Sequence, residues 1–194
     1  APLAIDEQLQ RVHTKKYVQY IRSVAPQAGL IRLDPDTAMG PMSLSAALHS
    51  SGAVVLATDL VMSNKIKNAF CCVRPPGHHA GKEHAAGFCI FNNIAVGVAH
   101  AIAKHGLERV AIVDFDVHHG NGTQEAFYTN NRVLYISLHQ WPHYPGSGWI
   151  NEVGEGEGRG FTVNIPLPPG GGNAAYRDAF ERVVAPITER FVPS

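Results

Sequence analysis

The sequence has little charge and no excess of either sign. Only 16% of its 194 residues are charged, and sixteen lysines and arginines balance sixteen aspartates and glutamates. No cluster of lysine or arginine occurs along the chain, so nothing in the charge pattern indicates a phosphate-backbone partner. We therefore expect no nucleic-acid partner.

Cysteine is scarce, and long apolar runs are missing. The three cysteines, of which Cys71 and Cys72 are adjacent, form neither a disulfide framework nor a CxxC zinc motif, which favours a reducing compartment. The apolar runs look too short to span a bilayer, and the first residues, APLAIDEQLQ, lack the pattern of a signal peptide. We expect a cytoplasmic protein without membrane contact, and the sequence leaves its oligomeric state open.

What is present is typical of a compact globular protein. Hydrophobic residues make up 45% of the chain, and 194 residues fit one domain with a core of its own. No internal repeat or linker interrupts the sequence, so we predict a single domain over residues 1–194.

Periodicity predicts helices alternating with buried strands. The predicted helices cover residues 6–24, 43–62, 92–105 and 173–190, and the predicted strands cover residues 68–77, 109–117, 132–139 and 160–167. Strands that are apolar on both faces and separated by helices favour a parallel sheet covered on both sides. We therefore predict an α/β fold with three layers, α/β/α, and a mainly parallel sheet. The glycine-rich GEGEGRG at 154–160 precedes a strand, so we interpret it as a surface loop and not as a dinucleotide-binding loop.

Histidine is abundant, with eleven copies, and one pair follows the apolar run RVAIV in VDFDVHHGNGTQEAF (113–127). On a strand, period two sends Asp114, Asp116 and His118 to one face, at the carboxyl end where open α/β sheets bind ligands. Asp116 and His118 are suitable ligands for one zinc ion, which needs about three protein ligands at a catalytic site. A buried, hydrogen-bonded network without a metal is the alternative.

A second histidine pair lies in RPPGHHAG (74–81), also just past a predicted strand. Two prolines and a glycine stiffen this turn, and His78 and His79 could divide catalytic duties, with one as general base or acid and the other as electrostatic support. Read alone, the pair is more typical of surface or structural histidines. Because both pairs end buried strands, we predict that this loop and the strand tip with Asp116 and His118 converge on one site.

Four ordered blocks resemble the zinc-dependent histone deacetylase family, which has the arginase/deacetylase fold. They are RPPGHHA (74–80), GFCIFNN (87–93), VDFDVHHGNGTQ (113–124) and ISLH (136–139), and the resemblance runs from about residue 9 to the end. RPPGHH and Asn121 resemble class II members and bacterial acetylpolyamine amidohydrolases more than class I. The resemblance implies a zinc-dependent amidohydrolase that removes acetyl groups from acetyl-lysine in proteins or from acetylated polyamines and other small amines.

The resemblance also implies catalytic roles. In the family the second histidine of the tandem, here His79, is the main general base and acid, and the first, His78, stabilises the transition state. Asp114 matches the acidic partner that orients His78. Asn121 takes the position beside His79 where class I members carry aspartate, which should leave His79 less basic.

Metal and substrate sites are implied in the same way. Asp116 and His118 match the Asp and His ligands of the family's zinc. The family's structural potassium site matches the backbone carbonyls of Asp114, Asp116 and His118, with Ser137 and Leu138. The resemblance also implies a second monovalent site around Phe127 and Val133. The substrate contacts implied are Gly87, whose carbonyl holds the amide N–H, and Phe88 and Tyr144 as walls of the acyl-lysine channel, with Trp141 as the alternative to Tyr144. Asp34 or Asp36 matches a carboxylate at the channel rim.

The sequence departs from the family at its ends. The family's third zinc ligand, an aspartate, and its transition-state tyrosine belong to later blocks than APITERFVPS, and the opening strand is missing. The acidic residues Asp178, Glu181 and Glu189 lie on an amphipathic helix and are predicted to be solvated. We therefore expect a fragment cut at both ends, with an incomplete fold and little or no deacetylase activity.

Two other functions stay open. An arginase-type binuclear manganese hydrolase shares the fold, but it needs a further carboxylate where this sequence has Gly120. A non-catalytic acetyl-lysine binding module would keep the pocket and lack the chemistry.

The remaining cysteines and histidines are given structural or surface roles. Cys71, Cys72 and Cys89 are predicted to lie in the core. His13, His49, His100 and His105 are predicted to be surface residues, and His139 and His143 to flank the channel mouth.

Overall fold

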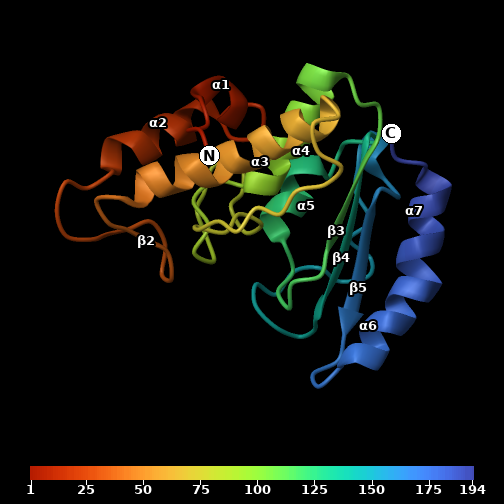
Figure 1. The fold of residues 1–194 in the computed structure, drawn as a ribbon. Helices are drawn as coiled ribbons and strands as arrows, with labels where there is room; N and C mark the ends of the chain where they lie inside the picture. Colours follow the sequence, from red (N-terminus) through yellow and green to blue (C-terminus); the bar gives the residue numbers. More distant parts are fainter. The chain divides into compact units, whose positions relative to one another are not determined.

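The structure is a computed structural model that describes all residues from 1 to 194. It consists of two compact units, residues 1–106 and residues 107–194. In Figure 1 the first unit runs from red to green, and the second runs from green to blue and contains a parallel sheet. The single domain expected over residues 1–194 stays a prediction.

Helices α3 (Ser43–Met62) and α4 (Asn93–His105) form the framework of the first unit and pack against each other (Figure 1). Gly97 permits their close approach, because a Cβ atom there would come within 2.3 Å of Val54 Cγ1 on α3. Both helices were predicted, and α3 has the predicted bounds. The other elements of this unit are α1 (Asp6–Leu9), α2 (Lys15–Val24) and the short antiparallel strands β1 (Ile31–Arg32) and β2 (Ala38–Met39).

The predicted helix over 6–24 is interrupted, and the interruption shapes the centre of this unit. Thr14 caps α2 because its hydroxyl oxygen accepts a hydrogen bond from the Tyr17 amide at 3.2 Å. The Thr14 amide donates a hydrogen bond to the Lys82 carbonyl at 3.0 Å, a typical length for such a bond. This amide therefore does not make the intrahelical bond that would continue α1. The break leaves His13 buried between the two helices' ends, with 1% of its surface exposed.

The strand predicted at 68–77 is not present, so that prediction is wrong. These residues form no strand ladder, Phe70 is 91% exposed, Cys72 is exposed and Cys71 is half-buried. Their apolar residues favour an extended chain, but a strand also requires a neighbouring strand to which its backbone is hydrogen-bonded. In the first unit, no strand pairs with residues 68–77. The core assignment holds only for Cys89, which is fully buried.

Helix α3 is long and apolar enough to cross a membrane by length and composition alone. The expectation that all apolar runs are too short is therefore wrong by that criterion. A third of its most apolar 18-residue window is buried, and Ala47, Leu48 and Val55 belong to the hydrophobic core of the first unit together with Val96 of α4. Core helices of soluble proteins pass the same test, so the finding is weak evidence for a membrane segment.

The second unit is built on a parallel sheet in the order β3-β4-β5. Leu134, Ile136 and Leu138 on β4 pack against the C-terminal helical segment, which runs along one face of the sheet (Figure 1). The elements are β3 (Val110–Asp114), α5 (Asn121–Phe127), β4 (Val133–Gln140), a 3-10 turn (Gly156–Gly158), β5 (Thr162–Leu167), α6 (Asn173–Ala179), a π-helical turn (Phe180–Val184) and α7 (Ala185–Phe191).

The strands of this sheet confirm three of the predicted ones, and their register sets where the predicted ligands lie. Asp114, the last residue of β3, pairs with Ser137 of β4, which pairs in turn with Asn164 of β5. The carboxyl ends of parallel strands are where such sheets place their ligands. Helix α5 was not predicted.

Candidate active site

The carboxylates that follow β3 fold the chain out of the strand. The Asp116 amide donates to Asp114 Oδ1 at 3.2 Å, and the His118 amide donates to Asp116 Oδ1 at 2.8 Å. Aspartate favours such local bonds to backbone amides two residues ahead, which compete with the strand ladder. The strand therefore ends at Asp114 and not at the predicted residue 117, and the next donors stand on a short turn.

Asp116 and His118 are positioned as a pair of metal ligands. Asp116 Oδ1 lies 3.2 Å from His118 Nδ1, and both side chains are partly exposed. Two ligand atoms bound tetrahedrally to one zinc at 2.0–2.1 Å would lie about 3.3 Å apart. The donor set and its spacing therefore fit two ligands of a zinc ion.

Aromatic side chains of the loop after β4 surround His118. The His143 ring stacks on the His118 ring with centroids 5.0 Å apart, and the Tyr144 ring meets it edge-on at 5.8 Å. The Trp141 ring instead packs on the Trp149 ring, with centroids 5.2 Å apart. Tyr144 and not Trp141 thus stands beside the predicted zinc ligand.

Asp114 is held from the neighbouring strand. The Tyr135 hydroxyl lies 3.2 Å from Asp114 Oδ2 and 3.1 Å from the Gly120 carbonyl oxygen. Burial and the nearby Asp114 carboxylate raise the pKa of Tyr135, so its hydroxyl stays protonated and donates to these oxygens. Ser137 and Leu138 are buried on the same strand, and Ser137 pairs with Asp114. Asp114, Ser137 and Leu138 of the predicted potassium site therefore lie on two adjacent strands.

The second histidine of this pair, His119, is a core residue. It is fully buried between Ser147 Oγ, 2.8 Å from Nδ1, and Gln124 Oε1, 3.0 Å from Nε2. Burial, followed by the nearby His139, lowers the pKa of His119 to about 4. The prediction that His139 flanks the channel mouth is wrong, because His139 is fully buried with Nε2 2.8 Å from the Gly148 carbonyl oxygen.

The first unit gathers four of the predicted residues. The rings of His78 and His79 lie 4.0 Å apart, and His79 is buried while His78 is half-buried. Gly87 lies directly against His79, since a Cβ atom on Gly87 would come within 2.2 Å of His79 Cδ2. The adjacent Phe88 is 61% exposed, as the wall of an open channel would be. A glycine at 87 is therefore required by the imidazole that it contacts.

Residues 1–194 match the protein-family model described as "Histone deacetylase domain" over their whole length. The chain belongs to this family. It is 47% identical over 194 residues to a "Histone deacetylase-like amidohydrolase" of Pseudomonas aeruginosa, covering all of this chain and 51% of that protein. It is 43% identical over 187 residues to a "Probable deacetylase" of Archaeoglobus fulgidus, covering 96% of this chain and 51% of that protein.

A solved structure confirms the fold of this histone deacetylase family chain. The crystal structure of the HDA15 HD domain matches with a TM-score of 0.93 and 42% identity, covering 100% of this chain and 57% of that one. The predicted α/β class and the predicted family are thus confirmed. The chain spans about half the length of the curated relatives named above.

The predicted convergence of His78 and His79 with Asp116 and His118 joins residues of different units and stays a prediction, as does the place of Asn121 beside His79. Tandem histidines and the Gly87–Phe88 turn belong to residues 1–106, and the metal-type ligands belong to residues 107–194.

His13 was predicted to be a surface residue, but it is buried and its ring has two backbone partners. His13 Nδ1 lies 2.9 Å from the Gly81 carbonyl oxygen, and the Asn92 amide donates to Nε2 at 2.9 Å. The ring thus carries its proton on Nδ1 and joins the two ends of the segment that contains Gly87. Burial lowers the pKa of His13 to about 4, so the ring is neutral at pH 7.

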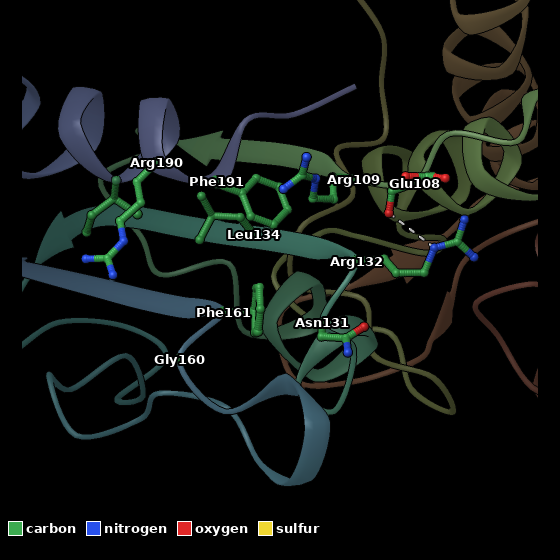
Figure 2. A pocket seen from close by; sticks show the side chains of 10 residues that line it. Glu108, Arg109, Asn131, Arg132, Leu134, Gly160, Phe161, Arg190 and Phe191 are labelled. Carbon is green, nitrogen blue, oxygen red and sulfur yellow. Dashed lines mark hydrogen bonds between the residues drawn. The ribbon is translucent and has the colours of Figure 1, made fainter.

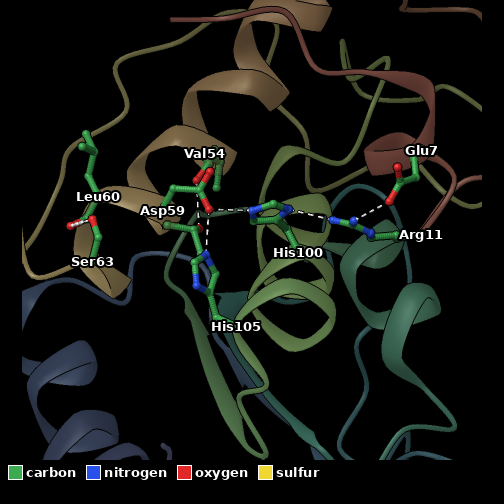
Figure 3. Close-up of polar contacts among 9 residues, drawn as sticks. Glu7, Arg11, Val54, Asp59, Leu60, Ser63, His100 and His105 are labelled. Carbon is green, nitrogen blue, oxygen red and sulfur yellow. Dashed lines mark hydrogen bonds and ion pairs between the residues drawn. The ribbon is translucent and has the colours of Figure 1, made fainter.

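His100 was also predicted to be a surface residue and is buried, in a group with metal-type donors (Figure 3). Asp59 Oδ1 lies 2.8 Å from His100 Nε2 and 2.7 Å from His105 Nε2. Arg11 Nη1, however, lies 2.7 Å from His100 Nδ1, and a guanidinium can only donate. The His100 proton is therefore on Nε2, directed at Asp59, and that nitrogen is not free to bind a metal.

A cavity of about 820 Å³ lies at the end of the sheet where the strands begin (Figure 2). It is lined by residues just before or at the start of the strands and by Ile187, Arg190 and Phe191 of α7, whereas Asp116 and His118 follow β3. Arg109 and Arg132 line it, and the Arg132 guanidinium donates to the Leu107 and Glu108 carbonyls at 2.6 and 3.2 Å. None of the predicted site residues lines this cavity.

Proposed function

We propose that residues 1–194 carry the general-base histidines, two zinc ligands and the acyl-binding turn of a zinc-dependent deacylase. Its proposed substrates are acetyl-lysine side chains of proteins or acetylated polyamines. The observation that carries the proposal is the 3.2 Å separation of Asp116 Oδ1 and His118 Nδ1 after β3, in a chain that matches the histone deacetylase domain throughout.

Asp116 and His118 would hold the zinc ion. When bound, such an ion polarises a carbonyl oxygen and lowers the pKa of a bound water. A site with two ligands from these residues needs at least one more ligand to reach the three that catalytic zinc sites use. We therefore expect residues 1–194 by themselves to bind zinc weakly and to show little deacylase turnover.

The histidine pair would handle the protons. His79 is buried against Gly87, so its ring has one orientation, and it would accept the proton of the attacking water at a ring nitrogen and return it to the leaving amine. His78, with its ring 4.0 Å from that of His79, would stabilise the negative charge that develops on the carbonyl oxygen. Phe88, exposed beside Gly87, would line the path of the acyl-lysine chain.

Zinc affinity of residues 1–194 tests the metal part, measured by competition with a chromophoric chelator. Asp116→Ala and His118→Ala should each weaken zinc binding by more than about tenfold. Loss of a residue that only hydrogen-bonds to a metal ligand already weakens metal binding by about that factor. Asp59→Asn is the matched control in the other metal-type group and should leave the affinity unchanged. Equal affinity in all of these variants would contradict the zinc assignment.

Binding and hydrolysis of an acetyl-lysine peptide and of an acetylated polyamine test the substrate part. Binding that requires zinc, together with slow acetate release that His79→Ala lowers by roughly 10²–10⁴-fold, would support a deacylase. Tight binding without any release of acetate would favour the acetyl-lysine binding module. If neither compound binds, the substrate proposal is wrong.

A further inference from the structure

The turn that contains Gly87 and Phe88 has an unusual backbone. Ala86 and Cys89 pair across it, with the Cys89 amide donating to the Ala86 carbonyl at 2.8 Å, so Gly87 and Phe88 are its two central residues. Both have positive φ, +54° and +65°. Glycine adopts such values freely, whereas an aromatic residue with a Cβ atom does so only when its surroundings hold it there.

Two side chains from a distant loop hold this turn. The Gly87 amide donates to Asp36 Oδ1 at 3.1 Å, and the Phe88 amide donates to Thr37 Oγ1 at 3.0 Å. Both bonds span 51 positions of sequence. Backbone amides at the centre of a tight turn would otherwise bind water, so these two acceptors replace solvent at the point where the backbone is strained.

The loop that supplies the acceptors is itself organised. Asp34 Oδ1 accepts hydrogen bonds from the Asp36 amide at 2.9 Å and the Thr37 amide at 2.8 Å. The Thr37 hydroxyl donates to Asp36 Oδ1 at 2.9 Å, and Thr37 is 1% exposed. Thr37 Oγ1 thus donates to Asp36 and accepts from Phe88, which fixes its proton and its lone pair at once.

We propose that Asp36 and Thr37 are positioning residues for the Gly87–Phe88 turn and so set the rim of the acyl-lysine channel. This inference rests on the proposed function, which makes the Gly87–Phe88 turn part of an acyl-lysine channel. The carboxylate of Asp36 acts as a hydrogen-bond acceptor within the protein, and Asp34 acts one step behind it by shaping the loop. Neither needs to touch the substrate.

The alternative role for Asp36 is direct capture of a substrate backbone by its charge. The two roles predict different results for one conservative variant. Asp36→Asn keeps an oxygen that can accept from the Gly87 amide but removes the charge, whereas Asp36→Ala removes both. Thr37→Ser keeps the hydroxyl, and Thr37→Val removes it while keeping the shape.

Amide hydrogen exchange on residues 1–194, followed by NMR, tests the hydrogen bonds directly. Exchange at Gly87 and Phe88 should accelerate at least about tenfold in Asp36→Ala and Thr37→Val, because the loss of a typical hydrogen bond shifts an opening equilibrium by about that factor. In Asp36→Asn and Thr37→Ser, which keep the acceptor oxygen, exchange should accelerate less than about threefold. The Val96 amide in α4 is the internal control, because a general loss of stability would accelerate its exchange as well. Unchanged exchange at Gly87 and Phe88 in Asp36→Ala and Thr37→Val would overturn the proposal.

Affinity of the same zinc-supplemented variants for an acetyl-lysine peptide separates positioning from capture. If Asp36 is a positioning residue, the dissociation constant of the peptide should rise about tenfold in Asp36→Ala, because the loss of one hydrogen bond changes an affinity by about that factor. In Asp36→Asn, which keeps the hydrogen bond, it should stay within about threefold. An equal loss in both variants would overturn it in favour of capture by charge. If the unsubstituted chain binds no peptide, the proposed function fails, and hydrogen exchange alone then supports or overturns the hold of Asp36 and Thr37 on the turn.

Discussion

The backbone amide of Asn92 donates a hydrogen bond to Nε2 of His13, 79 positions earlier in the chain, at 2.9 Å. Because Nδ1 of the same ring binds the Gly81 carbonyl, protonation of His13 would place a donor against a donor at Nε2. We expect His13→Phe, which keeps ring contacts with Tyr17 and Phe91, to lower the free energy of unfolding at pH 7 by about 2–4 kcal/mol, since two buried backbone groups lose their partners. Urea unfolding measures this.

The same ring should make stability depend on pH. The folded pKa of His13, about 4, lies below the value of 6.5 for a free histidine, so the unfolded chain binds the proton more readily. The contribution of His13 is complete above pH 6.5 and is lost as the pH falls from 6.5 toward 4, by up to about 3 kcal/mol. His13→Phe should flatten this part of the profile. A profile that His13→Phe leaves unchanged would refute the assignment.

Gly87 should tolerate no side chain. In Gly87→Ala the new Cβ would come within 2.2 Å of His79 Cδ2, and the residue would also have to keep a φ of +54°. We expect a loss of about 2–5 kcal/mol, the sum of left-handed strain and of overpacking. The NMR signals of the His79 ring should move in the same variant, because the ring must shift.

Gly29 is the matched control for Gly87. Its φ is +70°, but nothing lies within 4 Å of a Cβ atom built there. Gly29→Ala should therefore cost only the left-handed strain, roughly 1–2 kcal/mol. Equal losses in the two variants would mean that the contact with His79 contributes nothing.

Tyr135→Phe should loosen Asp114 without opening the core. The variant keeps the buried ring and removes the hydroxyl that lies 3.2 Å from Asp114 Oδ2 and 3.1 Å from the Gly120 carbonyl oxygen. We expect unfolding to become easier by about 1–3 kcal/mol, because a buried acceptor loses its donor. Tyr176→Phe is a suitable control, since Tyr176 lies on α6 and is half-buried. If Tyr135→Phe leaves the free energy of unfolding unchanged, the hydroxyl of Tyr135 contributes no net stability and the prediction is wrong.

Local patterns sufficed for the elements whose apolar residues recur regularly. Helix α3 has the predicted bounds, and the strands β4 and β5 lie within two residues of theirs, because periodic or continuous apolar runs reflect burial directly. The strand expected at 68–77 failed on the same criterion, since an apolar run does not reveal whether hydrogen-bonded neighbours exist. Helix α5, with the sequence NGTQEAF, has too few apolar residues for its period to show.

Within the candidate site, the proximity of Asp116 and His118 was predictable because the two residues are close in the sequence. Asp116 and His118 meet because they are two residues apart on a turn, and His79 meets Gly87 eight residues later. His13 was missed because its partners are 68 and 79 positions away. A lone histidine after a short helix is typical of a surface, and only the fold shows that two backbone groups require it.

Arg11 and His100 give the last prediction, which concerns the group with Asp59 and His105. Because the Arg11 guanidinium donates to His100 Nδ1, long-range ¹H–¹⁵N spectra at pH 8 should show the proton of His100 on Nε2. One equivalent of zinc should leave the ring signals of His100 and His105 unchanged. Arg11→Met removes the donor and allows the proton to move to Nδ1, so zinc should then perturb both rings, while Asp59→Asn in the same background should abolish that response. Zinc-induced shifts of His100 in the unsubstituted chain would show that Arg11 does not keep the metal out.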